Sequence, residues 1–217
     1  MSFKKILFNR ISQEEMARAS SDFLSLMRYR RSVREFSDQD IPIEVIKNIV
    51  SAAAAAPAAA NQEPWYFSIV SDPVVKHEIR IRAENEEKAF YTHKAPASWL
   101  EDLNKFGTDW HKEFLDVAPY LIIVFKQIYD LQNGEKYKNY YVNESVGIAC
   151  GILLTAIHSA GLVALTHTPS PMGFLEKACK RPPNERAFLL IPVGYPDDNA
   201  KVPDLKKKQF SDYAEII

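Results

Sequence analysis

The spacing of apolar residues predicts two helices in the first quarter of the chain. The first is expected over 12–28, with Ser12 as its N-cap, because apolar residues recur there at helical spacing. They are Met16, Phe23, Leu24 and Met27. Pro42 is expected to open a second helix and Pro57 to stop it, since proline suits the first turn of a helix but not its interior. The apolar stripe of this second helix is Ile43, Ile46, Ile49 and Val50.

Four short runs rich in β-branched and aromatic residues predict strands. They span 65–70, 120–125, 162–166 and 188–193. Helices are expected over 73–90 and 138–160, a long, partly helical loop over 92–109, and a turn at 132–135. This order of elements indicates an α+β fold with four to five strands, in a single domain over 1–217 that ends in an extended tail over 196–217.

Composition and charge narrow the class of protein. The chain has 217 residues, with 27 Lys+Arg against 28 Asp+Glu and a net charge of −1, which argues against electrostatic binding of nucleic acid. It has only 7 glycines, and neither glycine-rich phosphate motif occurs. Cys150 and Cys179 make no disulfide framework, and the five histidines lack metal-ligand spacing. The longest apolar run, 148–157, is short for a membrane span, so we expect a cytoplasmic protein with no metal, nucleic-acid or membrane partner.

A basic cluster follows the first predicted helix. Arg30, Arg31 and Arg34 place three guanidinium groups within five residues. Guanidinium donors match phosphate oxygens, so the cluster is a candidate phosphate site in a chain without a glycine-rich loop. The alternative is a solvated basic turn that pairs with Glu35 and Asp38.

Two loops beside predicted strands are further candidates. The segment 56–65 joins a helix stop, small residues and a strand, so its backbone amides could bind an anionic ligand oxygen, unless it is a plain connector. Thr166, His167 and Thr168 end a predicted strand, where polar side chains often face a site. The alternative there is turn chemistry before Pro169.

Taken in order, these segments resemble the nitroreductase-like flavoprotein superfamily and, within it, the iodotyrosine deiodinase family. The resemblance runs from about residue 25 to about residue 210 and rests on 30–36, 56–65, 72–77, 143–154, 189–196 and 202–206. It implies a central mixed or antiparallel sheet flanked by helices. It also implies an intertwined homodimer with FMN at the interface, where both subunits line each site.

The resemblance implies a role for each matching residue. Arg30, Arg31, Ser32, Arg34 and Lys207 would hold the flavin phosphate and nearby polar atoms, and the Thr168 hydroxyl would bond flavin N5. Further flavin contacts are implied for Ala58, Ala59, Thr166 and His167. The backbone amide of Ala60 would hydrogen-bond the substrate phenolate.

A zwitterion site is implied on the segment 84–112, which we expect to form a lid. Glu87, Tyr91 and Lys112 fall at the positions where deiodinases hold the amino acid part of the substrate. Glu87 and Tyr91 are four residues apart, on one face of a helix. A carboxylate can bind an ammonium, while an ammonium and a hydroxyl can bind a carboxylate.

The implied activity is the FMN-dependent reductive dehalogenation of a halogenated tyrosine to tyrosine and halide, with electrons from a reductase or NAD(P)H. Two alternatives are a general nitroreductase or NAD(P)H:flavin oxidoreductase, and a non-catalytic flavin- or amino-acid-binding protein. The chain departs from the family at Ala58-Ala59, where Ser-Gly is usual, at His167, which replaces a threonine, and at Lys207, which replaces an arginine.

Overall fold

The computed structural model describes residues 2–217 and divides the chain into two compact units, Met1–Arg30 and Arg31–Ile217, each described by itself. The first unit contains helix α1 (Gln13–Tyr29). Its start is fixed by a capping box, in which Ser12 Oγ accepts from the Glu15 N–H at 3.2 Å and Glu15 Oε2 accepts from the Ser12 N–H at 2.9 Å. The predicted helix and its cap are confirmed, while one domain over 1–217 stays a prediction.

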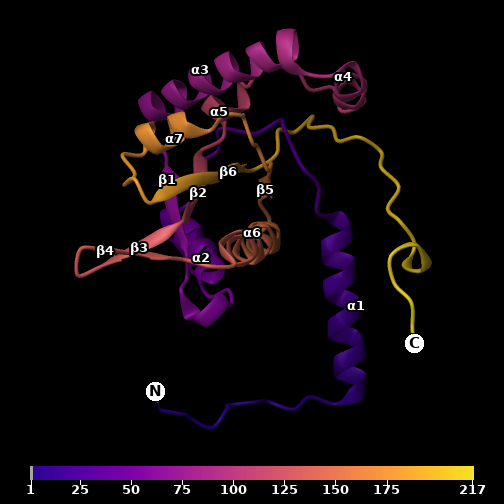
Figure 1. Ribbon diagram of the computed structural model, residues 1–217. Coiled ribbons are helices and arrows are strands. Elements are labelled where there is room, and N and C mark those ends of the chain that lie inside the picture. Colours follow the sequence, from indigo (N-terminus) through magenta and orange to yellow (C-terminus); the bar gives the residue numbers. More distant parts are fainter. Residues whose placement is uncertain (1) are drawn as a thin grey trace. The chain divides into compact units, whose positions relative to one another are not determined.

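The second unit is built on a four-stranded antiparallel sheet in the order β1-β2-β6-β5 (Figure 1). The strands are β1 (Trp65–Val70), β2 (Tyr120–Gln127), β5 (Val163–Ala164) and β6 (Glu185–Gly194). All four predicted strands are present, although β5 is shorter than expected and β6 longer. An isolated parallel bridge between Ser32 and Ala164 lies next to β5. The α+β prediction is confirmed.

Strand β2 is buried on both faces, and its alternate side chains enter two separate cores. Ile122 and Val124 belong to the core shared with α2 (Ile43–Ala54) and α6 (Val142–Ser159). Ile123 and Phe125 belong to the core on the opposite face. That face is covered by α3 (Pro73–Ala89), α5 (Phe114–Val117) and α7 (Gly173–Ala178) (Figure 1). The apolar run at this strand therefore reflects burial between two helical layers.

Helix α6 has the length and mean apolarity of a membrane-spanning helix. In the structure, however, its Val146, Ala149 and Leu153 are fully buried in the core shared with α2. The core helix of a globular domain passes the same test of length and composition. We therefore interpret α6 as a core helix.

The structure differs from the prediction in three places. The predicted turn at 132–135 is part of a hairpin, β3 (Tyr129–Gln132) and β4 (Glu135–Lys138), in which Asn133 and Gly134 both have positive φ. Helix α6 begins four residues later than expected because Tyr141 adopts the left-handed conformation. Helices α5 and α7 are too short to give a periodic signal.

The segment after α3 is partly helical, as predicted. It contains a π-helical turn, η2 (Phe90–Lys94), and then α4 (Ala97–Asn104). Elsewhere, the short 3₁₀ turns η1 (Ala59–Asn61) and η3 (Phe210–Asp212) lie before β1 and in the tail. The start of the tail is held by Glu35, which accepts from the Lys201 N–H at 2.6 Å.

Candidate active site

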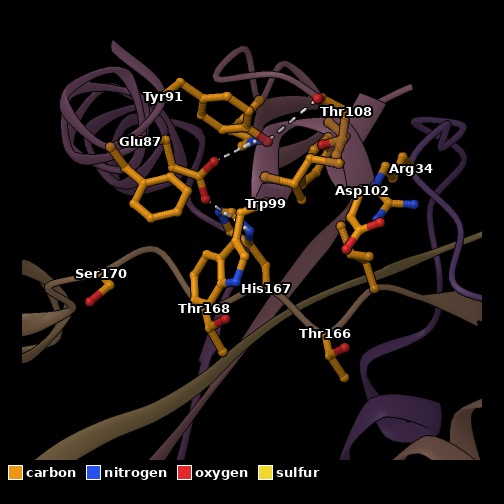
Figure 2. A pocket seen from close by; sticks show the side chains of 15 residues that line it. Arg34, Glu87, Tyr91, Trp99, Asp102, Thr108, Thr166, His167, Thr168 and Ser170 are labelled. Carbon is orange, nitrogen blue, oxygen red and sulfur yellow. Dashed lines mark hydrogen bonds and ion pairs between the residues drawn. The ribbon is translucent and has the colours of Figure 1, made fainter. Parts of the chain in front are cut away.

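A cavity of about 470 Å³ lies where the 87–114 segment faces the loop after β5 (Figure 2). It is lined by residues of α3, η2, α4 and α5, by Arg34, and by the loop after β5. The lining residues are Arg34, Glu87, Phe90, Tyr91, Trp99, Asp102, Leu103, Thr108, Lys112, Phe114, Leu165, Thr166, His167, Thr168 and Ser170. Seven of the residues predicted from the sequence are among them.

The three residues predicted to bind a zwitterion meet at this cavity. Lys112 Nζ lies 3.0 Å from Glu87 Oε2, and both side chains are largely buried, at 3% and 15% exposure. Lys112 Nζ also donates to the Asp109 carbonyl. Tyr91 sits in the π-helical turn directly after the helix that carries Glu87, and Lys112 Nζ lies 5.8 Å from the centre of its ring. The structure thus gathers a carboxylate, an ammonium and a phenol at one side of the cavity, where Figure 2 shows Glu87 and Tyr91.

Lys112 is fixed through its backbone as well as its side chain. Its N–H donates to Glu84 Oε1 at 2.8 Å, and Glu84 is buried in α3. The same carboxylate accepts from Arg80 Nε at 2.8 Å, and Arg80 Nη1 reaches Asp116 Oδ2 at 2.8 Å. This chain of charge-assisted hydrogen bonds connects α3 to α5 and fixes the position of the Lys112 backbone.

The Tyr91 phenol stays protonated at neutral pH. Burial raises its pKa, and the Glu87 and Asp109 carboxylates raise it further, whereas its hydrogen bond to the Thr108 carbonyl (3.4 Å) and the Arg34 charge act in the opposite direction. Tyr91 is therefore a hydrogen-bond donor for a ligand and not an anion.

Arg34 brings a second positive charge to the cavity. It is partly buried, and this burial lowers the pKa of its guanidinium. Arginine keeps its charge in proteins, so Arg34 is a cation. No carboxylate of residues 31–217 lies within ion-pairing distance of it. Arg34 is thus a half-buried cation that can bind an anionic or carbonyl oxygen of a ligand.

The residues 166–168 alternate along an extended segment. The His167 N–H donates to the Leu190 carbonyl at 2.9 Å and the Leu190 N–H returns a bond at 3.0 Å, so this register fixes which way each side chain faces. Thr166 and Thr168 are exposed, while His167 is buried on the other side, towards Glu87 (Figure 2). Burial, with the Lys112 and Arg34 charges, lowers the pKa of His167 to about 3, so its imidazole is neutral.

The other predicted residues of 31–217 do not line this cavity. Arg31 donates to the Pro203 carbonyl, and Ser32 forms the bridge to Ala164. Lys207 is exposed in the tail, and Arg30 belongs to the first unit as the C-cap of α1. Their roles in holding a phosphate stay predictions.

The loop 58–60 forms a separate feature near the start of α6. The Ala59 N–H donates to Ser145 Oγ at 3.5 Å, which connects this loop to α6. Ala60 and Asn61 have positive φ of 48° and 56°, a conformation that is costly for residues with a Cβ. Such strain often accompanies a functional backbone geometry. Ala58, Ala59 and Ala60 do not line the cavity.

Sequence reasoning missed several residues of the cavity wall. Trp99 and Asp102 come from α4, and Phe114 comes from α5. Phe90 lies 5.9 Å from Trp99, ring centre to ring centre, and this aromatic pair covers one side of the cavity. The apolar residues at helical spacing in 97–104 could have predicted helix α4, which carries Trp99 and Asp102, but not its place at the cavity. In the part of the chain that the structure describes, no group of three metal-ligating side chains occurs.

Comparison with known proteins shows the family to which this chain belongs. The nitroreductase family model matches residues 27–195. Iodotyrosine deiodinase of Haliscomenobacter hydrossis is 60% identical over 90% of this chain and 88% of its own length. The chain belongs to the iodotyrosine deiodinase branch of the nitroreductase family.

Other members of the family agree with this assignment. Human iodotyrosine deiodinase 1 is 46% identical over 92% of this chain and 70% of its own length. A crystal structure of oxidized iodotyrosine deiodinase bound to FMN and 3-iodo-L-tyrosine matches with a TM-score of 0.73 and 33% identity, covering 90% of this chain and 96% of that one. An FMN-bound nitroreductase from Bacteroides fragilis matches with a TM-score of 0.67 at 20% identity, which supports the fold alone.

Proposed function

We propose that this deiodinase-family chain is an FMN-dependent oxidoreductase that removes halide from halogenated tyrosine, releasing tyrosine. The observation that carries the proposal is the meeting of Glu87, Tyr91 and Lys112 at one cavity wall. Relatives named iodotyrosine deiodinase, which are 60% and 46% identical to this chain, support the same activity.

The triad matches the amino acid part of such a substrate. A ligand ammonium can take the place of Lys112 beside the Glu87 carboxylate, and a ligand carboxylate can accept from Lys112 and from the Tyr91 phenol. A ligand that carries only one of these charges would leave the other protein charge buried without a partner. The site therefore favours a zwitterion over a phenol with a single charge.

Three further residues of the cavity suit FMN. Arg34 is a half-buried cation with no carboxylate of residues 31–217 as a partner. The Thr166 and Thr168 side chains are both exposed on one extended segment, 166–168. We assign the flavin ring to Arg34, Thr166 and Thr168, and the phosphate to Arg30, Arg31, Ser32 and Lys207. Bound FMN, once reduced, supplies the two electrons that replace a carbon–halogen bond by a carbon–hydrogen bond, with one proton taken up and halide released.

The protein's own groups orient the substrate and exclude water. The Ala60 N–H, at the start of a 3₁₀ turn, is offered to the phenolate oxygen. The segment 84–112, with Phe90 and Trp99, acts as the lid over the amino acid part. The Thr168 hydroxyl would donate a hydrogen bond to the bound flavin.

We also propose that the working form is a homodimer. The loop 58–60 does not line the cavity of its own protomer, so a second subunit would bring Ala60 to the substrate. Helix α6 leaves an open face for such a partner, where Gly147 and Gly151 have no atom within 4 Å of an added Cβ and Ile148 is 47% exposed. Helix α1 likewise has no buried residue, and its Phe23 and Leu24 are about half exposed. The electron donor, a reductase or NAD(P)H, and a cytoplasmic location remain expectations from the sequence.

A titration of bound-flavin fluorescence tests the proposal. Iodotyrosine should quench the flavin at much lower concentration than tyrosine, and Glu87→Gln should weaken iodotyrosine binding by at least 100-fold without changing FMN content. A general nitroreductase would instead reduce nitroarenes rapidly with NAD(P)H, and Glu87→Gln would leave that turnover unchanged. Quenching that does not distinguish iodotyrosine from tyrosine would contradict halotyrosine recognition.

A further inference from the structure

His167 is a buried polar side chain at the cavity wall whose ring nitrogens lack hydrogen bonds. Nε2 is buried and has no partner within the described residues, and Nδ1 lies 3.8 Å from Glu87 Oε1, beyond hydrogen-bond distance. Leaving such a group unsatisfied is costly, and native proteins satisfy nearly all of their buried polar groups. The unmade bond between Nδ1 and Glu87 Oε1 therefore indicates an arrangement that is completed when a ligand is present.

The surroundings of His167 leave the Glu87 carboxylate as the group to which its imidazole can hydrogen-bond. Its ring packs edge-on against Phe114, with ring centres 5.9 Å apart, and its backbone is held by Leu190 in both directions. The side chain therefore has little freedom to turn away from Glu87. It faces away from the exposed Thr166 and Thr168 side chains, to which we assign the flavin ring.

Glu87 has two oxygens with different partners. Oε2 is bound by Lys112 Nζ at 3.0 Å, and Oε1 faces His167 Nδ1. When Lys112 turns to a ligand carboxylate, Oε2 becomes free for the ligand ammonium. Oε1 then needs a donor of its own to hold the carboxylate in one orientation, and Nδ1–H is the donor that faces it.

We propose that His167 is a positioning residue for zwitterion recognition: as a neutral imidazole it donates Nδ1–H to Glu87 Oε1 in the liganded site and so aims Oε2 at the substrate ammonium. This inference rests on the proposed function and deepens it, because it assigns a part of substrate selectivity to a residue at which this chain departs from the family pattern. The low pKa of His167 agrees with a neutral donor.

The test compares two ligands on holoenzyme variants. His167→Ala should weaken binding of iodotyrosine by about 5- to 20-fold and raise its KM to the same degree, with kcat little changed. Binding of the deaminated analogue, 3-(4-hydroxy-3-iodophenyl)propanoate, should change less than 2-fold, since it has no ammonium for Glu87. FMN content, read from the visible absorbance, should be unaffected.

Conservative variants identify the nitrogen that acts. His167→Asn can place an amide N–H where Nδ1 lies and should restore most of the iodotyrosine affinity, whereas His167→Gln, which extends to the position of Nε2, should not. Equal losses for both ligands, or rescue by Gln and not by Asn, would overturn the proposal. If the wild-type holoenzyme binds iodotyrosine no better than tyrosine, the proposed function itself fails, which is a separate outcome.

Discussion

The Lys112 ammonium lies 3.0 Å from Glu87 Oε2, in a cavity wall where both side chains are largely buried. Each charge therefore depends on the other while no ligand is bound. Removal of one partner leaves the other as a buried, uncompensated charge, which is usually more costly than the loss of the whole pair.

We expect Lys112→Met to lower the free energy of unfolding by about 3 kcal/mol, because the Glu87 carboxylate is left buried without its cation. The double variant Glu87→Gln/Lys112→Met should lose clearly less than the sum of the two single variants. Urea unfolding of the ligand-free protein measures all three. Additive losses would mean that the ion pair contributes no coupling.

Glu84 is expected to position Lys112 through its backbone. Glu84→Ala removes the acceptor of the Lys112 N–H and of Arg80, and should lower the free energy of unfolding by about 2–3 kcal/mol and weaken iodotyrosine binding. The matched control is Glu78→Ala, which breaks the Glu78–Arg82 pair, also four residues apart on α3 but half exposed. The control should change stability by less than about 1 kcal/mol. Similar effects for the two variants would contradict a special role for Glu84.

Burial of neutral His167 should make the protein less stable in acid. An unfolded histidine titrates near pH 6.5, whereas in the folded protein the pKa of His167 is about 3. Between these values the unfolded chain binds a proton that the folded chain does not. Stability should therefore fall as the pH drops from about 6.5 towards about 3, at up to about 1.4 kcal/mol per pH unit from this group, with no contribution above that window.

The contribution of His167 is isolated by comparing the stability of wild type and His167→Gln over pH 4–7. The carboxylates titrate in both proteins, so their contributions cancel in the difference. The stability difference between the two should shift in favour of the glutamine variant as the pH falls. A difference that stays constant across this range would show that His167 does not remain neutral in the folded protein.

A bulky side chain on the open face of α6 should prevent dimer formation and leave the fold of the single chain intact. Gly151→Leu adds a good helix former at a position with no neighbouring atom within 4 Å, so the protomer should keep its fold. If this face meets a second subunit, the variant should run as a monomer in size-exclusion chromatography with light scattering, and it should retain little FMN. Glu78→Leu, at a half-exposed position of α3, is the control. A dimeric, yellow Gly151→Leu protein would exclude this face from the interface.

The sequence predicted those parts of the site that depend on local spacing. Glu87 and Tyr91 are four residues apart, and α3 with its π-helical continuation carries both to the same cavity. The four strands were found because each contains a run of β-branched and aromatic residues, and in β2 this run is buried by helices on both faces. Pro57 ended the second helix within three residues of the predicted position.

What the sequence could not provide comes from tertiary pairing. The direction of the His167 side chain is set by its register with Leu190, more than twenty residues away. The anchoring of Lys112 by Glu84 joins residues 28 positions apart. Trp99 and Asp102 reach the cavity only because the segment after α3 folds back, which no local pattern specifies.

The most direct measurement of the central claim is the product of a single anaerobic turnover. FMN-loaded protein is reduced with dithionite, the excess reductant is removed, and one equivalent of iodotyrosine is added. The account predicts one tyrosine and one iodide per reduced flavin, and a Glu87→Gln variant that yields neither at the same substrate concentration. Recovery of intact iodotyrosine from the wild-type protein, with FMN bound and reduced, would contradict it.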